Sequence, residues 1–185
     1  EWGGKNPAGV FDDAENLDHV AGHVVNAAFW NGGQNCSAAS RLIVHKAVKP
    51  ALMEKIAARM RDWKTGDPLD PANYIGALID AGHCEKVRSY LDTKGSGPFV
   101  EPVVLEVKPG DRRATEEIFG PVLCVIEVAS NDEAVRLAND TEYGLAASIF
   151  SASGRKGIRA ARDIRAGTVT VNCYGEGNIA TPFGG

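Results

Sequence analysis

The chain has 185 residues and a mass of 19.6 kDa, which is enough for one ordinary domain with a sizeable buried core. Apolar residues make up 44% of it and charged residues 24%, as in soluble globular proteins, and no apolar run approaches the roughly 18 residues that a membrane helix needs. The net charge is −4 and no cluster of lysine or arginine stands out, so we expect neither nucleic acid nor a membrane as a partner.

Cysteine usage indicates the compartment. The chain has four cysteines, Cys36, Cys84, Cys124 and Cys173, and none of them belongs to a CxxC pair. This pattern suits a reducing environment, so we expect a cytoplasmic protein. The first residue is not methionine and the last two are glycines, from which we expect the chain to be part of a longer polypeptide.

The first predicted elements flank a cysteine. Apolar residues recur with helical spacing over 17–29, and Gly32 and Gly33 then end the helix. The β-branched run 42–44 predicts a buried strand. Cys36 therefore lies in the connection between a helix and a strand.

Further along the chain, helical and extended patterns alternate. They predict a helix over 50–60, a turn-rich connection over 66–73, a helix over 79–91, an extended segment over 99–107, a strand over 122–128, a helix over 130–137, a strand over 146–150, a helix over 157–165 and a strand over 168–171. The strand over 122–128 is apolar almost throughout, as in a strand covered on both faces. The alternation predicts an α/β fold with a mainly parallel sheet flanked by helices.

The most distinctive motif is NGGQNCSAASR around Cys36. Glycines before the sulfur and small residues after it would give the backbone freedom and the free N–H groups that favour a thiolate nucleophile. A buried structural cysteine is the alternative, and the residues alone leave both interpretations open for Cys36. Cys84, Cys124 and Cys173 fit the structural interpretation, because they lie in or directly after predicted elements.

Two further motifs place carboxylates beside glycine. Glu1 precedes Gly3 and Gly4, which would let a substrate approach a carboxylate that acts as a base on water. In the EEIFGP motif at 116–121, one carboxylate could hold a pair of hydroxyl groups while Phe119 presents a flat face. From the residues alone, a solvated terminal glutamate and a charged loop with its phenylalanine in the core are the preferred interpretations.

The remaining patterns carry weaker signals. The histidines and cysteines lack the spacing of metal ligands, so we expect no metal. The sequence contains neither GxGxxG nor a P-loop motif. The loop 174–178, with Phe183 beyond it, could border a substrate entrance or form a surface turn. A cysteine hydrolase that pairs Cys36 with His45 or His83 stays open as an alternative function.

Five segments together resemble the aldehyde dehydrogenase superfamily in order and approximate spacing. They are EWGGK at 1–5, GQNCSAASR at 33–41, EEIFGPV at 116–122, Asn139 with YGL at 143–145, and VNC at 171–173 through PFGG at 182–185. The resemblance covers the whole chain and identifies residues 1–185 as the family's catalytic domain, without its cofactor-binding domain and its C-terminal tail. It implies the α/β fold predicted above, NAD or NADP as cofactor, a small aldehyde as substrate, and a homo-oligomer.

The resemblance also implies a mechanism. The cysteine of the family's GQxC motif is the nucleophile, which is Cys36 here. Its thiolate would add to the aldehyde, and the oxyanion would be held by the Cys36 N–H and an asparagine of the missing segment. Hydride transfer to NAD(P)+ would leave a thioester, which water activated by Glu1 would hydrolyse.

Cofactor contacts follow from the same resemblance. Glu117 matches the residue that binds the nicotinamide ribose hydroxyls, and Phe119 matches the aromatic residue beside the nicotinamide. Gly3 and Gly4 would let that ring approach closely.

Trp30 and Phe183 correspond to positions that line the family's aldehyde pocket. The segments 67–71 and 78–80 and the Gly-Glu-Gly loop at 175–177 look most like the branch that oxidises amino- or γ-glutamylamino-aldehydes. Since the chain would hold only one side of the cofactor contact, a catalytically incompetent α/β fragment is the alternative. We expect little or no dehydrogenase activity from these residues alone.

Overall fold

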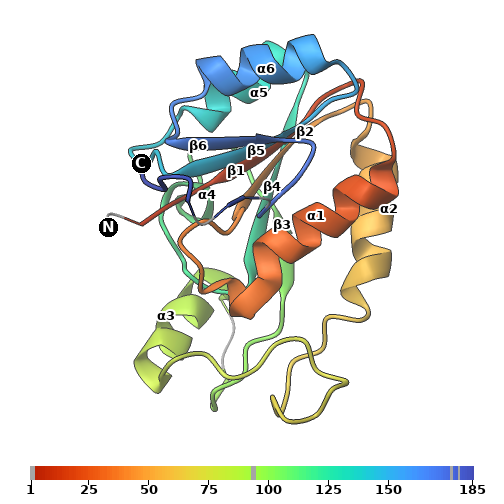
Figure 1. Cartoon of the computed structure of the whole chain (residues 1–185). Coiled ribbons are helices and arrows are strands. Elements are labelled where there is room, and N and C mark those ends of the chain that lie inside the picture. Colours follow the sequence, from red (N-terminus) through yellow and green to blue (C-terminus); the bar gives the residue numbers. More distant parts are fainter. Residues whose placement is uncertain (1–2, 93–94, 176, 179) are drawn as a thin grey trace.

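The described residues fold into one sheet of six parallel strands with helices on both faces (Figure 1). The computed structural model describes residues 3–92, 95–175, 177–178 and 180–185. The strands are β1 (Pro7–Val10), β2 (Arg41–His45), β3 (Val103–Glu106), β4 (Val122–Val128), β5 (Ala146–Phe150) and β6 (Thr168–Val171). Their order across the sheet is β3-β4-β2-β1-β5-β6, and each pairing between these strands is parallel. The predicted α/β fold with a mainly parallel sheet is confirmed.

The helices largely follow the predicted pattern. They are α1 (Leu17–Phe29), the 3-10 turn η1 (Trp30–Gly33), α2 (Lys49–Met60), α3 (Ala81–Leu91), α4 (Arg112–Thr115), α5 (Asn131–Ala138) and α6 (Gly154–Asp163). The bounds of α1 are those that its apolar spacing predicts. Within the described part of the chain, no helix has both the length and the apolar character needed to cross a membrane.

Two helices begin at residues other than those predicted, because side chains cap them. The helix expected over 79–91 begins after Asp80, whose carboxylate accepts a hydrogen bond from an N–H of the first turn. The helix expected over 157–165 begins earlier, after Ser153, whose hydroxyl caps it in the same way. The sequence predicted neither the strand β1 nor the short helix α4.

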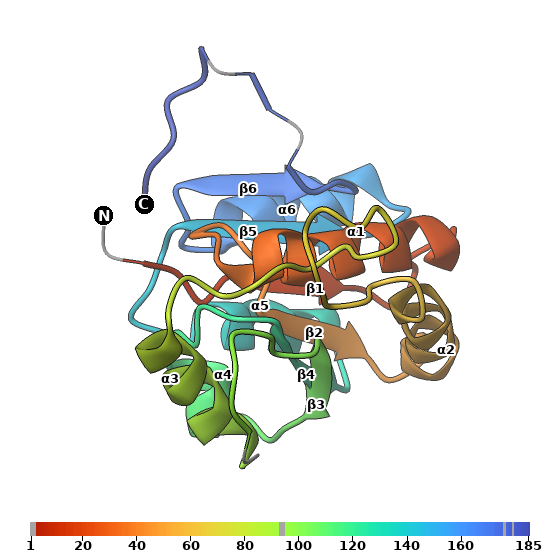
Figure 2. The ribbon, with the colours of Figure 1, turned by 90° about the horizontal axis from the view of Figure 1, so that it is seen from below.

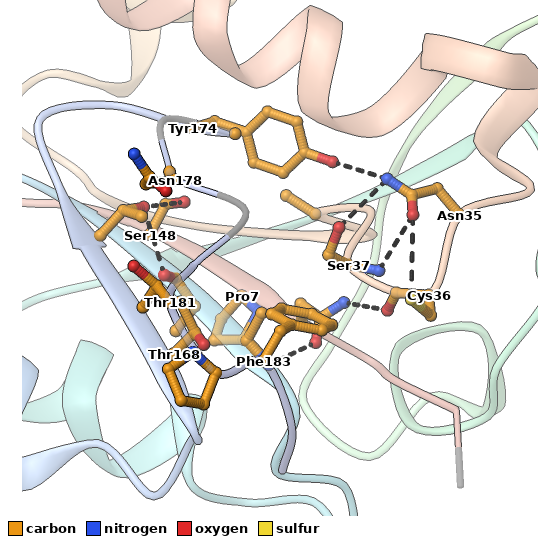
Figure 3. Close-up of a pocket in the computed structure, with 18 residues that line it drawn as sticks. Pro7, Asn35, Cys36, Ser37, Ser148, Thr168, Tyr174, Asn178, Thr181 and Phe183 are labelled. Atoms are coloured by element: carbon orange, nitrogen blue, oxygen red, sulfur yellow. Dashed lines mark hydrogen bonds between the residues drawn. The ribbon is translucent and has the colours of Figure 1, made fainter. Parts of the chain in front are cut away.

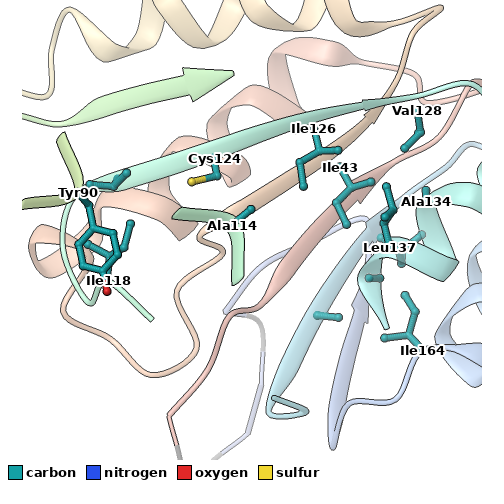
Figure 4. Packing of buried hydrophobic residues seen from close by; sticks show 14 of the residues in the cluster. Ile43, Tyr90, Ala114, Ile118, Cys124, Ile126, Val128, Ala134, Leu137 and Ile164 are labelled. Atoms are coloured by element: carbon teal, nitrogen blue, oxygen red, sulfur yellow. The ribbon is translucent and has the colours of Figure 1, made fainter. Parts of the chain in front are cut away.

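The sheet lies between two apolar layers. Side chains alternate along β2, so that Leu42 and Val44 join the layer under α1 and α2, whereas Ile43 joins the opposite layer. Residues of α3, α5 and α6 close that second layer, and Figure 4 shows Leu137 of α5 close to Ile43. Because helices cover both faces, the central strands are apolar almost throughout.

The parallel arrangement decides which loops meet. The loops that precede β1, β2, β4 and β5 all lie at the amino edge of the sheet; they are residues 3–6, 34–40, 116–121 and 139–145. The chain after β6 turns back toward the same edge, where Gly184 contacts Gly167 directly ahead of β6 (Figure 2). Motifs far apart in the sequence are therefore gathered at one edge.

Candidate active site

Glu117 is held against the glycines that precede β1. Its Oε1 accepts a hydrogen bond of 2.8 Å from the N–H of Gly4, a residue 113 positions away in the sequence. Gly3 has a φ of +77°, and a Cβ placed there would lie 2.6 Å from Glu117 Oε2. Only glycine leaves room for the carboxylate in this position. The structure thus brings together three of the residues to which the family resemblance gives a role in cofactor binding.

The adjacent carboxylates of the EEIFGP motif have different surroundings. Glu116 is exposed, and its Oε2 accepts a hydrogen bond of 2.6 Å from the hydroxyl of Tyr90 on α3. That bond raises the pKa of Tyr90. Glu117 is half-buried and faces Gly4 instead. The two carboxylates are therefore divided between a contact with α3 and the candidate site.

Phe119 is half-buried beside α3. Its φ is +58°, in the left-handed region, and the neighbouring Ile118 provides the buried anchor of the loop at 2% exposure. His83 Nε2 donates a hydrogen bond of 2.6 Å to the Phe119 carbonyl oxygen, and the two rings meet edge to face with centroids 6.1 Å apart. The interpretation that places Phe119 in the core does not hold, because Ile118 takes that place.

Asn6 fixes the loop that carries Cys36. Its Nδ2 donates to the carbonyl oxygens of Cys36 at 2.7 Å and Ala38 at 2.9 Å, and its Oδ1 accepts from the N–H of Ala146 at 3.0 Å. A Cβ on Gly4 would lie 2.6 Å from the same Cys36 oxygen. The role of Asn6 could not be predicted from the sequence, because its hydrogen-bond partners lie 30 or more positions away.

Cys36 borders a cavity at the amino edge (Figure 3). The cavity has a volume of about 710 Å³ and lies between the β5–β6 side of the sheet and the C-terminal segment. Its wall is mostly apolar, and several residues with hydroxyl or amide side chains also line it; among them are Asn35, Ser37, Ser148, Thr168, Tyr174 and Thr181. A second cavity of about 880 Å³ also includes Cys36 and reaches the loop before β5. The half-buried Cys36 is thus open to a small molecule from this edge.

The predicted pocket residues lie in different places. Phe183 lines both cavities together with Cys36 and is 56% exposed. Trp30 begins η1 and is 55% exposed, and it is not among the described residues that line either cavity. Glu1, the predicted base, lies outside the described residues.

The other cysteines differ from Cys36. Cys84 and Cys124 are buried, and their thiols donate to the carbonyl oxygens of Pro98 and Arg113. Burial raises the pKa of the Cys124 thiol. Cys173 is half-buried, in contrast to the expectation of a buried structural cysteine, because it follows β6 at the edge of the sheet.

Two buried cations lie on the face of the sheet opposite α1. Lys5 is 1% exposed, its Nζ has no hydrogen-bond partner among the described atoms, and burial lowers its pKa to about 8. Arg41 beside it donates to three carbonyl oxygens, those of Lys5 at 2.7 Å and of Leu137 and Ala138 at 3.0 Å. Arg41 thereby ties the segment before β1 to the end of α5.

The histidines considered for a hydrolase are engaged elsewhere. His45 ends β2, at the edge of the sheet opposite Cys36, and its Nε2 donates to the Ala129 carbonyl oxygen at 2.9 Å. His83 donates to the Phe119 carbonyl oxygen. Within the described part of the chain, no group of three or more His, Cys, Asp or Glu side chains is arranged to hold a metal ion.

Comparison with known proteins gives one consistent result. Residues 1–185 match the model of the "Aldehyde dehydrogenase family". The chain is 56% identical to the aminoacetaldehyde dehydrogenase of Pseudomonas aeruginosa PAO1, over 100% of the chain and 40% of that protein. The curated relatives are therefore much longer than the chain, which spans about 40% of their length.

Solved structures agree with the sequence matches. The crystal structure of gamma-glutamyl-gamma-aminobutyraldehyde dehydrogenase from Burkholderia cenocepacia J2315 gives a TM-score of 0.94 at 45% identity and covers 100% of the chain and 41% of that structure's chain. The betaine aldehyde dehydrogenase from Staphylococcus aureus, solved in complex with NAD+, gives a TM-score of 0.93 at 32% identity, with coverages of 100% and 40%.

Proposed function

Since the chain belongs to the aldehyde dehydrogenase family, we propose that it carries the nucleophile and one side of the nicotinamide site of an NAD(P)+-dependent aldehyde dehydrogenase. The observation that supports this most strongly is the meeting of Cys36, Gly4 and Glu117, which come from three separate loops, at one edge of the sheet. We refer below to a polypeptide of the relatives' length that contains these residues as the full-length protein.

The residues at this edge fit the nicotinamide ribose of a dinucleotide. The Gly4 N–H orients the Glu117 carboxylate, and the missing side chain of Gly3 leaves space beside it. A carboxylate held in this way accepts hydrogen bonds from a pair of hydroxyl groups. Glu117, Phe119, Gly3 and Gly4 would hold this half of the cofactor, and NAD(P)+ bound there would take up a hydride from the substrate.

Cys36 would act on the aldehyde carbon. Its thiolate forms an S–C bond, and the carbonyl oxygen becomes an oxyanion that the Cys36 N–H stabilises. After the oxidation the same carbon carries a thioester to Cys36. Water that has lost a proton to Glu1 attacks this thioester, the S–C bond breaks, and the carboxylic acid leaves. Sulfur suits both steps, because a thiolate is a good nucleophile and a good leaving group.

For the substrate we propose an amino- or γ-glutamylamino-aldehyde. The similarity to an aminoacetaldehyde dehydrogenase and a gamma-glutamyl-gamma-aminobutyraldehyde dehydrogenase supports this class. Among the residues that line the cavity, Asn35, Ser37 and Asn178 offer side-chain groups that could bind the polar end of such an aldehyde. We further propose that the full-length protein acts in the cytoplasm as a homo-oligomer.

The direct test is an assay of NAD(P)+ reduction by the full-length protein with a panel of aldehydes. We expect kcat/KM for a short amino-aldehyde to exceed that for an alkanal of equal length by roughly tenfold or more, about the effect of one or two satisfied hydrogen bonds. The residues described here, purified alone, should show little or no activity. Failure of every aldehyde to reduce the cofactor would refute the proposed function, whereas a preference for alkanals would refute the substrate class only.

Glu117→Gln should weaken cofactor binding more than aldehyde binding. The amide keeps the shape of the carboxylate but lacks the charge that strengthens its hydrogen bonds to hydroxyl groups. We expect the KM for NAD(P)+ to rise roughly tenfold while the KM for the aldehyde changes little. Steady-state kinetics with each substrate varied separately measures both values. Glu116→Gln is the matched control, since Glu116 bonds Tyr90 instead of Gly4, and equal effects of the two substitutions would contradict the assignment.

A further inference from the structure

The side chain of Asn35 connects the sulfur of Cys36 to a tyrosine far along the chain. Asn35 Nδ2 donates hydrogen bonds of 3.1 Å to the hydroxyl oxygens of Ser37 and Tyr174, and Asn35 Oδ1 lies 3.9 Å from Cys36 Sγ (Figure 3). We propose that Tyr174 is a positioning residue for the nucleophile, which acts by holding the Asn35 amide with its oxygen toward the sulfur. This inference rests on the proposed function only in taking Cys36 as the nucleophile.

The bonding partners of the amide determine which of its ends faces the sulfur. An amide nitrogen offers two N–H donors, and Tyr174 and Ser37 accept both of them. The Ser37 N–H, 3.5 Å from Asn35 Oδ1, favours the same orientation, because a rotated amide would place an NH2 group against it. Cys36 therefore faces a hydrogen-bond acceptor, to which a protonated thiol can donate and a thiolate cannot.

Tyr174 is itself held in place by the helix α1. Its N–H donates to His23 Nδ1 at 3.2 Å, and His19 Nε2 donates to the Asn172 carbonyl oxygen at 3.2 Å. Both histidines belong to α1, and their rings contact each other edge to face. The turn after β6 is thereby held in place on α1, and its tyrosine reaches a residue 139 positions earlier in the sequence.

The position of the Asn35 oxygen should affect the reactivity of Cys36 before substrate and cofactor bind. An acceptor beside the sulfur favours the thiol over the thiolate, and the thiolate is the form that alkylating agents and oxidants attack. The Asn35 amide held by Tyr174 thus keeps Cys36 less reactive until the substrate or the cofactor changes its surroundings. Releasing the amide should make the free enzyme more reactive toward alkylation at neutral pH.

Charged and titratable groups on the neighbouring elements also face this region and remain in every variant below. They are Glu117 on the loop before β4, Glu142 and Tyr143 on the loop before β5, and His23 on α1. Their contribution is common to the compared proteins, so a difference between variants reports on the Asn35 amide.

The test is the rate of alkylation of Cys36 by iodoacetamide in the full-length protein without aldehyde or cofactor. The rate is followed across a range of pH, and mass spectrometry of the peptide that contains Cys36 makes it specific to that site. In Tyr174→Phe we expect the half-maximal rate at a lower pH, and a rate roughly two- to tenfold higher near neutral pH, which corresponds to one hydrogen bond. Tyr74→Phe is the matched control, because Tyr74 is exposed and its tilted ring contacts Trp63, neither of which lines the cavity.

A second substitution separates positioning from a general loosening of the loop. Asn35→Leu has a similar shape but no acceptor, so it should shift the profile in the same direction, and adding Tyr174→Phe to it should change nothing more. Ser37→Ala, which removes the other hydroxyl partner of the amide, should give a smaller shift of the same sign.

An unchanged midpoint in Tyr174→Phe would overturn the proposal, as would a full-sized Tyr174→Phe effect in the Asn35→Leu background. Circular dichroism verifies that each variant is folded. Neither negative result would contradict the proposed function, which is tested by dehydrogenase activity with aldehyde and NAD(P)+ present.

Discussion

Cys36→Ser is expected to remove the dehydrogenase activity of the full-length protein, with kcat lower by roughly a thousandfold or more. Serine has nearly the same shape, so the loop held by Asn6 should be retained. A hydroxyl group is a far weaker nucleophile than a thiolate at neutral pH, and the ester that it would form has a poorer leaving group than the thioester. Both chemical steps are therefore impaired, and spectrophotometric measurement of NAD(P)H formation reports the loss.

The control for this prediction is Cys173→Ser. Cys173 is half-buried at the end of β6 and has no role in the proposed chemistry. We expect it to keep activity within roughly threefold of the unaltered protein, as for a surface substitution away from the site. If Cys36→Ser retains most of the activity, or if both serine variants lose it equally, Cys36 is not the nucleophile.

Lys5→Met is expected to stabilise the fold at neutral pH. The Lys5 ammonium is 1% exposed and has no hydrogen-bond partner among the described atoms, whereas methionine fills a similar volume without a charge. The difference between a pKa of 10.5 in the unfolded chain and about 8 in the folded one corresponds to about 3 kcal/mol of unfolding free energy. Urea denaturation of both proteins near neutral pH measures the gain.

The pH dependence of that gain has a definite sign. Between about pH 8 and pH 10.5 the unfolded chain keeps the Lys5 proton while the folded chain has lost it, so the unfolded state binds more protons. The free energy of unfolding of the unaltered protein therefore rises with pH across this window. The advantage of Lys5→Met should be largest below about pH 8 and should fade toward pH 10.5. Other groups titrate in this range, but they are common to both proteins.

Lys86→Met provides the comparison for this stability prediction. Lys86 is exposed on α3, so its replacement should change the free energy of unfolding by about 0.5 kcal/mol or less at any pH. A Lys5→Met protein that is less stable than the unaltered one near neutral pH would show that the ammonium is well solvated or paired in the folded state.

Elements with strong local patterns could be predicted from the sequence, and those that depend on neighbours could not. The helix α1 shows its apolar stripe within its own 13 residues. The strand β1 has the sequence PAGV, which starts with proline, contains glycine and shows no alternation, so it gave no local signal. It is extended because β2 and β5 pair with it on both sides, which is a property of the assembled sheet.

The residues of the candidate site also differ in whether the sequence could predict them. The motif around Cys36 was visible as one candidate for a reactive cysteine, but its partner Asn6 lies 30 positions away, and Tyr174, which bonds the neighbouring Asn35, lies 139 positions from Asn35. The link between Gly4 and Glu117 spans 113 positions, and only the family resemblance anticipated it. The burial of the Lys5 ammonium could not be predicted from the sequence, since burial of a charge depends on the packing of the whole domain.

The place of the site on the sheet also has a structural reason. Ligands of open parallel sheets usually bind beyond the carboxyl ends of the strands. Here the candidate residues precede β1, β2, β4 and β5, so they meet at the amino ends, and the segment after β6 returns to that edge. The usual rule for parallel sheets therefore does not predict where these candidate residues lie.

The central claim, that Cys36 forms a covalent acyl intermediate, is tested most directly by trapping that intermediate. The full-length protein with Glu1→Gln, in which hydrolysis of the thioester should be slow, is mixed with aldehyde and NAD(P)+ and quenched in acid. Mass spectrometry of the resulting peptides should show the acyl group on the peptide that contains Cys36, and only when the cofactor is present. An acyl group on any other residue, or cofactor reduction without acylation of Cys36, would contradict the account.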